Sequence, residues 1–345
     1  MKTNIKCYSQ CILYILFSPV RWLLEAALKI FNLVILYRIF DGIGDTIAMT
    51  TILSGLNKRL GCKGIILSRT PAIFENNDQV VAFIDYGKLS KLTRSLLKFI
   101  FRHSRGSRIF SVGPEIWTPG SYPWAPQPHG VFQEKFYEGL QPDARYRVDT
   151  SSVRPVLAFS EQELERFAKK YSHLPEHYCI VKATGGTCAY NWARLKEWSP
   201  DRFQSVISSL NHLNWVQIGQ EGEPALDGVI NLLGQASLRE VFYLLSRAQA
   251  VLTVEGMISH AMAAFDAPAI VVFSGAHDPR GLLYHNTHPV VAATLPPCTP
   301  CWGKGCSVPG KPCTGAITAQ QVVTAIEQAM KGKTQEGIIQ FPAQP

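Results

Sequence analysis

The sequence lacks several patterns that would indicate a function at once. It has no short Lys/Arg-rich block, no aromatic RNA-binding signature and no zinc-finger spacing, which argues against a nucleic-acid partner. The uncharged stretch at residues 7–20 is shorter than the roughly twenty apolar residues that a membrane-spanning helix needs. That stretch opens like a secretory signal, but no small-x-small cleavage site follows it. These absences favour a globular protein.

The length and composition set the scale of that protein. At 345 residues and 46% hydrophobic content, the chain can build two cores. The net charge of +8 suits a phosphorylated partner or an anionic membrane, although a solvated scatter of lysines gives the same sum. The nine cysteines, without a convincing signal, indicate a reducing and therefore cytoplasmic environment.

Residues 1–32 predict apolar or amphipathic helices. One set of side chains is expected on a single face, consisting of Trp22, Leu23, Leu24, Ala27, Leu28 and Phe31. This face suits the interface of a membrane, and packing on the protein's own core explains the pattern equally well.

Strand and helix patterns then alternate along the chain. Strands are predicted at 34–39, 64–68, 80–84 and 108–112, with helices at 46–60 and 91–101. The stretch 114–128 is rich in Pro, Gly, Trp and Tyr and predicts a long surface loop. A second series follows, with strands at 178–182 and 215–218 and helices that begin at Ser160, Ser199, Ser237 and Thr318. The plan predicts two doubly wound α/β domains, 33–172 and 173–345, which face a central cleft.

The most informative run, residues 251–275, predicts strand, acidic turn, helix and strand in succession. The strands are expected at 250–254 and 268–273, and the helix at 259–265. Ligands of open α/β sheets bind beyond the carboxyl ends of the strands. Glu255, Gly256, Ser259 and His260 are therefore candidates for an anion-binding site.

A second candidate is the turn Gly42-Ile43-Gly44-Asp45, between a strand and a helix. The glycines permit close approach of another molecule, and Asp45 is expected to project into the cleft. A helix N-cap is the simpler interpretation of Asp45 taken alone. The turn lacks the third glycine of a dinucleotide fingerprint.

Lys196 is a third candidate, because it precedes a helix that starts at Pro200 and can neutralise an anionic group. The loop Thr184-Gly185, which follows a strand, can donate N–H groups to phosphate. A solvated loop lysine is the simpler alternative.

Three motifs together carry a resemblance. Asp41-Gly42-Ile43-Gly44-Asp45, Lys196-x-Trp198, and Glu255 to His260 with Ala263-Ala264 resemble, in this order and spacing, glycosyltransferase family 9. That family contains the ADP-heptose lipopolysaccharide heptosyltransferases. The resemblance implies the GT-B fold, with acceptor binding by the first domain and nucleotide-sugar binding by the second. It also implies an inverting reaction without a catalytic metal, in agreement with the absence of a D-x-D motif.

The resemblance also implies roles for single residues. Asp45 matches the family's general base, Lys196 the lysine that stabilises the departing diphosphate, and His260 a histidine that faces the diphosphate. The implied donor-binding residues are Gly44, Thr184, Gly185, Lys196, Gly219, Glu255, Gly256, Met257, Ser259 and His260. Glu255 replaces an aspartate and Met257 a glycine, so the donor preference is expected to differ.

A late cysteine cluster is the last feature. Cys298, Cys301, Cys306 and Cys313 lie in a Pro/Gly-rich loop at 298–313 and have the reach for iron or zinc. Some family members carry a comparable cluster that binds iron. A reduced loop with packed thiols is the alternative.

The expected function is transfer of heptose or a related sugar from a nucleotide-sugar donor, ADP-heptose being the first candidate, to a lipid-linked glycan, lipopolysaccharide-core or protein acceptor. The expected place is the cytoplasm, with peripheral contact on the cytoplasmic face of the inner membrane. A nucleotide-sugar epimerase of the same fold and a non-catalytic membrane-docked scaffold are the alternatives.

Overall fold

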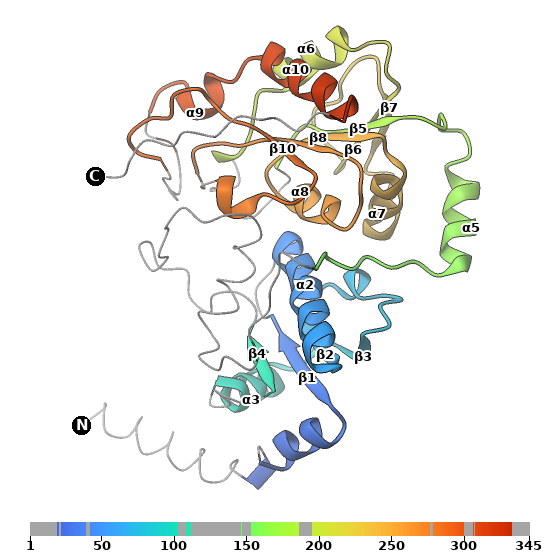
Figure 1. The fold of residues 1–345 in the computed structure, drawn as a ribbon, viewed down its shortest axis with the longest axis vertical. Helices are drawn as coiled ribbons and strands as arrows, with labels where there is room; N and C mark the ends of the chain where they lie inside the picture. Colours follow the sequence, from blue (N-terminus) through green and yellow to red (C-terminus); the bar gives the residue numbers. More distant parts are fainter. Residues whose placement is uncertain are drawn as a thin grey trace. The chain divides into compact units, whose positions relative to one another are not determined.

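The computed structural model describes residues 19–20, 22–38, 42–102, 108–111, 146, 153–185, 195–276, 279–299, 306 and 308–332 (Figure 1). Contacts divide the chain into two compact units. Unit 1 comprises Met1–Trp117 and Gln133–Val156, and unit 2 comprises Thr118–Phe132 and Leu157–Pro345. The predicted loop at 114–128 lies outside the described residues.

Unit 1 contains a parallel sheet of four strands. The strands are β1 (Leu33–Tyr37), β2 (Lys63–Ser68), β3 (Val80–Asp85) and β4 (Ile109–Ser111). Their order is β3-β2-β1-β4, so the chain moves outward from β1 in one direction and returns to its other side. The four predicted strands are confirmed, because a short apolar run without Pro satisfies its backbone best inside such a sheet.

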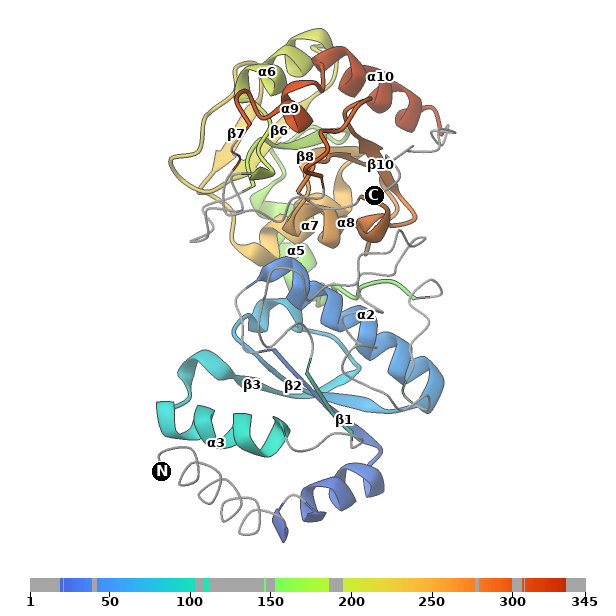
Figure 2. The same cartoon turned by 90° about the vertical axis from the view of Figure 1, so that its left-hand side faces the viewer.

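The helices of unit 1 lie on both faces of this sheet. Figure 2 shows α2 (Ile43–Leu60) on one face, and α3 (Lys91–Arg102) with the helix at residues 22–30 on the other. Gly61 ends α2 at φ 64°, a left-handed conformation that glycine adopts without strain. The 3-10 turns η1 (Pro71–Ile73) and η2 (Tyr86–Lys88) flank β3.

Two expectations for unit 1 were wrong in detail. The helix α2 begins at Ile43 and not at Thr46, because Gly42 serves as its N-cap. The apolar residues of the N-terminal helix do not share one face, since Leu28 is buried while Trp22 and Leu23 are exposed. Leu28 follows Leu23 by five residues and Trp22 by six, and on a helix with 3.6 residues per turn these spacings place Leu28 on a different side from both.

Unit 2 contains a parallel sheet of six strands. The strands are β5 (Cys179–Lys182), β6 (Trp215–Gly219), β7 (Ile230–Leu233), β8 (Ala250–Val254), β9 (Ala269–Val272) and β10 (Thr287–Val290). Their order is β10-β9-β8-β5-β6-β7. The sequence did not predict β7 and β10, the two edge strands. Each has only four residues, and β10 contains Pro289, which an edge strand tolerates.

The helices of unit 2 are α5 (Glu161–Lys170), α6 (Pro200–Ser209), α7 (Leu238–Arg247), α8 (Met257–Met262), α9 (Pro312–Gly315) and α10 (Ala319–Met330), with the 3-10 turn η6 (Pro279–Leu282). Capping boxes begin α5, α7 and α10, as the Ser and Thr positions predicted. The helix α8 spans 257–262 and not 259–265, because Ser259 is its third residue and bonds back to Gly256.

The helix α5 belongs to unit 2 by its contacts. Glu163 on α5 binds Arg239 on α7 through both carboxylate oxygens, at 3.0 and 2.7 Å. The contact division therefore falls between Val156 and Leu157, whereas the boundary predicted from the sequence is residue 172. Within the described residues, no helix combines the length and apolar character that crossing a membrane requires.

The α5–α7 contact gives a stability prediction. Hydrogen bonds from Arg239 lower the pKa of the Glu163 carboxyl more than its burial raises it. This stabilisation is present above the unfolded pKa and is lost as the pH falls through the lower folded pKa. Glu163→Gln is expected to reduce the free energy of unfolding by about 3 kcal/mol at neutral pH, because it leaves Arg239 without its buried charge partner.

Urea unfolding followed by circular dichroism measures this difference. The gap between wild type and variant should shrink as the pH falls below the ordinary pKa of a glutamate and then through the lower pKa of the native Glu163 carboxyl. Glu161→Gln, on an exposed position of the same helix, is the matched control and should change little. Equal stability of the Glu163→Gln variant at neutral pH would refute the assigned contribution.

Candidate functional site

The strand order of unit 2 reverses between β5 and β8, which pair in parallel register. At such a reversal the connections leave in opposite directions and open a crevice beyond the carboxyl ends of the two strands. Lys182 ends β5, and the half-buried Thr184 and Gly185 follow it. Glu255 follows β8 directly. The sheet therefore brings several of the predicted donor-binding residues to one edge.

Lys196 and Glu255 form a buried ion pair. The Lys196 Nζ lies 2.5 Å from the Glu255 Oε2, with the side chains 10% and 6% exposed. The backbone N–H of Glu255 donates to the carbonyl of Val272, which continues the ladder beyond β8 and positions the Glu255 backbone. A solvated loop lysine is thus ruled out for Lys196. Its ammonium is an unusual buried cation that one carboxylate neutralises.

A second buried pair lies at the end of β5. The Lys182 Nζ donates to the Thr184 Oγ1 at 2.7 Å and to both Glu223 oxygens at 2.7 and 2.6 Å. Burial lowers the pKa of the Lys182 amine, and Glu223 partly offsets this effect. Gly219 is required beside this pair, since an added Cβ would overlap the Glu223 carboxylate and lie 2.6 Å from Leu233.

The turn from β8 to α8 presents backbone to open space. A Cβ added to Gly256 would meet no atom within 4 Å, so a ligand can approach this backbone. The Ser259 hydroxyl accepts from the Gly256 N–H and donates to the Gly256 carbonyl. Ser259 therefore shapes the turn, whereas the half-buried Met257 is the first helical residue.

His260 is buried and held by a tyrosine. Its Nδ1 lies 2.6 Å from the Tyr284 hydroxyl, and the two rings meet edge to face at 5.7 Å. Either atom can supply the proton, depending on the histidine tautomer. The Tyr284 contact fixes the orientation of the imidazole.

The strand order of unit 1 reverses between β1 and β4, so the carboxyl end of β1 corresponds to the carboxyl end of β5 in unit 2. Arg38 follows β1, is buried, and forms an ion pair with the Oδ2 of Asp45. Gly42 gives room for this pair, since an added Cβ would lie 2.8 Å from Asp45 and 3.1 Å from Arg38. The helix N-cap is Gly42, so Asp45 does not serve as a cap, and Gly44 lies in the first turn.

The structure thus places the predicted residues in two groups. Asp45 and Gly44 belong to unit 1, and the other predicted donor-binding residues belong to unit 2. Sequence reasoning missed Arg38, Lys182, Glu223 and Tyr284. A signal existed for the first two, because each is a single basic residue at the end of an apolar strand. Glu223 and Tyr284 carry no local signal.

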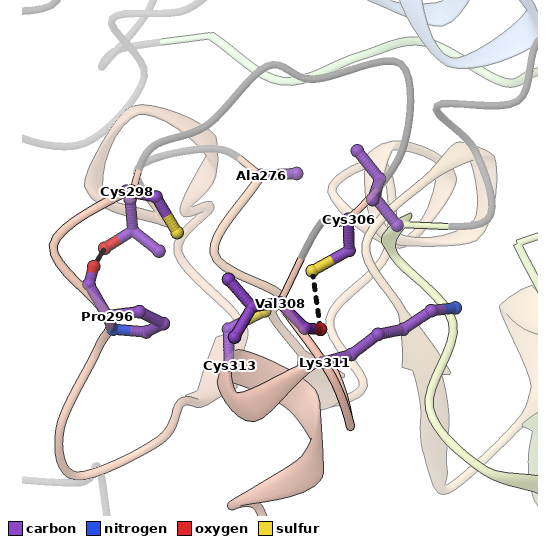
Figure 3. A pocket seen from close by; sticks show the side chains of 9 residues that line it. Ala276, Pro296, Cys298, Cys306, Val308, Lys311 and Cys313 are labelled. Carbon is purple, nitrogen blue, oxygen red and sulfur yellow. Dashed lines mark hydrogen bonds between the residues drawn. The ribbon is translucent and has the colours of Figure 1, made fainter.

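The described thiols of the cysteine loop surround one pocket (Figure 3). Cys298, Cys306 and Cys313 line it, and the Cys306 thiol donates to the Val308 carbonyl at 3.4 Å. The described part of the chain contains no group of three side chains that could hold a metal ion. Cys301 lies outside the described residues, so the four-thiol site stays a prediction.

Comparisons with known proteins identify the same part of unit 2. Residues 147–311 match the family model of glycosyltransferase family 9 (heptosyltransferase). This range includes Lys196, Glu255 and His260, together with the end of β5. No curated protein sequence matches the chain.

Solved structures share the fold at low sequence identity. The ADP-heptose lipopolysaccharide heptosyltransferase II of Escherichia coli superimposes with a TM-score of 0.60 at 13% identity, over 87% of this chain and 99% of that one. A family 9 glycosyltransferase from Veillonella parvula gives 0.63 at 14% identity, over 87% and 98% of the two chains. A dodecameric iron-containing glycosyltransferase from enterotoxigenic E. coli gives 0.58 at 16% identity, over 87% and 76%.

These matches confirm the predicted GT-B architecture, with one parallel sheet in each unit. They also confirm the resemblance that the motifs carried. Residues 147–311 match glycosyltransferase family 9, and the chain shares its fold with solved heptosyltransferases.

Proposed function

We propose that the protein transfers heptose or a related sugar from a nucleotide-sugar donor, with ADP-heptose as the first candidate, to a lipopolysaccharide-core or other glycan or protein acceptor, with inversion at the anomeric carbon. The observation that carries this proposal is the buried Lys196–Glu255 pair at the edge where β5 and β8 end. A cation at this edge suits a diphosphate, and the carboxylate beside it suits sugar hydroxyls. Two of the similar solved structures contain ADP-heptose or a fluorinated analogue of it.

Asp45 is the proposed general base. Its carboxylate takes the proton of the acceptor hydroxyl while that oxygen attacks the anomeric carbon. Arg38 binds the Oδ2 atom and so orients the carboxylate, which projects from the first turn of α2 and is 23% exposed. We assign Arg38 the role of a positioning residue, since it acts through Asp45.

Lys196 is the proposed stabiliser of the leaving group. As the bond between the sugar and the diphosphate breaks, negative charge grows on the phosphate oxygens, and the buried ammonium lowers its energy. His260, oriented by Tyr284, is the second group that faces the diphosphate in this proposal. Glu255 then contacts the sugar or ribose hydroxyls, and the exposed backbone at Gly256 admits the donor.

The proposed reaction involves two substrates and no catalytic metal ion. The donor is a nucleotide sugar, and the acceptor is a lipid-linked glycan or a protein. The transfer itself needs no metal ion in this scheme. An iron or zinc ion at Cys298, Cys301, Cys306 and Cys313 would be structural, and no step passes through it.

Asp45→Asn tests the base assignment. It removes the proton acceptor and keeps the side-chain size, so turnover should fall by roughly 10²–10⁴-fold while ADP binding is unchanged. Turnover is measured as ADP release from ADP-heptose with a lipopolysaccharide-core acceptor, and ADP binding by calorimetry. The matched control is Asp78→Asn, at an exposed position of unit 1. Normal turnover in the Asp45→Asn variant would rule out its role as the base.

Glu255→Gln separates the two halves of the donor site. The change removes the charge that neutralises Lys196, so ADP should bind at least as tightly as it does to the wild type. ADP-heptose should bind about tenfold more weakly relative to ADP, because the sugar loses a charged acceptor. Calorimetric titration with both ligands measures the ratio.

The exposed Glu221→Gln substitution controls for a general change of charge in unit 2. A Glu255→Gln variant that loses ADP and ADP-heptose affinity in equal proportion would show that Glu255 serves only to hold Lys196 in place. That result would contradict its assigned contact with the sugar.

A further inference from the structure

Unit 1 exposes large apolar side chains on two helices that the transfer reaction does not use. On the helix at residues 22–30, Trp22 is 68% and Ile30 76% exposed, and Leu23 and the following Phe31 are also exposed. On α3, Leu92 is 81% exposed and Leu96 is exposed as well. Single exposed apolar residues are common, but a group of them on neighbouring helices indicates a binding surface.

These helices also have apolar inner faces that are already covered. Leu28 is buried with Ile35 and Ile109, and Leu24 packs against the same cluster. Leu97 and Ile100 of α3 pack there too. The N-terminal helix therefore has one apolar stripe inward, at Leu24 and Leu28, and a second outward. A helix that is apolar on two sides normally has a second apolar environment around it.

The outward stripe follows helical spacing. Trp22, Ala26 and Ile30 are four residues apart, so they lie above one another on the side away from Leu28. The helix is held in place by Arg108, whose Nη1 donates to the Asn32 Oδ1 at 2.6 Å. The exposed stripe is therefore a fixed feature of unit 1.

The two helices lie on the same side of the sheet. Figures 1 and 2 both show α3 next to the N-terminal helix, on the face opposite α2. Their shared contact with the cluster around Ile35 and Ile109 agrees with this placement. We call the outward residues Trp22, Leu23, Ile30, Phe31, Leu92 and Leu96 the two-helix face.

The charge around the two-helix face identifies its partner. Between Lys88 and the end of α3 at Arg102 the chain carries five Lys and Arg residues and no Asp or Glu. Lys29, Lys88 and Lys91 are exposed on or beside the two helices. Basic residues around exposed Trp, Phe and Leu are the composition of helices that lie in the interface of an anionic bilayer. Nucleic acid would match the charge but would leave the aliphatic side chains in water.

We propose that the two-helix face docks unit 1 onto an anionic lipid surface, with the N-terminal helix and α3 side by side in the headgroup region. The proposal goes beyond the transfer reaction and does not depend on it. It assigns α3 to the contact as well as the N-terminus. A lipid-linked acceptor would reach a unit docked in this way without leaving the bilayer.

Co-sedimentation of the full chain with vesicles tests the proposal. Vesicles of phosphatidylglycerol and phosphatidylethanolamine should bind the wild type, and vesicles of phosphatidylcholine should bind it much less. The double variants Trp22→Ser/Ile30→Ser and Leu92→Ser/Leu96→Ser should each reduce the partition coefficient about tenfold or more. Lys88→Gln/Lys91→Gln should weaken binding to the anionic vesicles alone, and added salt should have the same effect.

The matched control is Leu164→Ser/Met330→Ser, at exposed positions of unit 2, which should bind like the wild type. Wild-type binding by the α3 variant would overturn the two-helix surface, and so would no vesicle binding by the full chain. A concentration-dependent dimer that the Trp22→Ser/Ile30→Ser change abolishes would identify a second copy as the partner. A lower melting temperature with unchanged vesicle binding would show that the chain itself covers this face. Either result would refute lipid docking.

Discussion

A buried cation at the carboxyl end of a central strand constrains both units. Arg38 follows β1 and Lys182 ends β5, and these are the strands at which each sheet reverses its order. A buried charge costs several kcal/mol of desolvation unless a partner neutralises it, so each cation requires a carboxylate. Asp45 and Glu223 supply these carboxylates, and Gly42 and Gly219 leave the space that the pairs occupy. The polar groups of each unit therefore gather at the edge where open sheets bind ligands.

The Lys196–Glu255 pair is the second buried charge pair at this edge of unit 2, after Lys182–Glu223. Its lysine comes from the segment after β5 and its glutamate from the turn after β8. Such a pair contributes little net stability compared with apolar side chains of similar volume. Its presence is better explained by the chemistry of a ligand that carries both phosphate and hydroxyl groups.

Local signals account for most of the fold that the sequence predicted. Apolar runs predicted the central strands, and the Ser and Thr capping residues predicted the starts of α5, α7 and α10. The edge strands β7 and β10 were missed because their four-residue runs are less apolar than those of β5 and β9: Asn231 interrupts β7, and β10 contains His288 and Pro289. The charge pairs could not be predicted, since Glu223 lies 41 residues from Lys182 and only the parallel ladder brings them together. The sequence also placed the start of α2 too late, which hid the contact between Arg38 and Asp45.

We propose above all that Lys196, at the carboxyl ends of β5 and β8, binds the diphosphate of an ADP-sugar. A thermal-shift titration of the wild type and a Lys196→Met variant with ADP-heptose, a GDP-sugar and a UDP-sugar measures this directly, since a ligand of the native state raises the melting temperature with its occupancy. We expect ADP-heptose to raise the melting temperature of the wild type the most, and we expect this shift to be lost in the variant. An equal shift in both proteins, or no shift with any of the three donors, would contradict it.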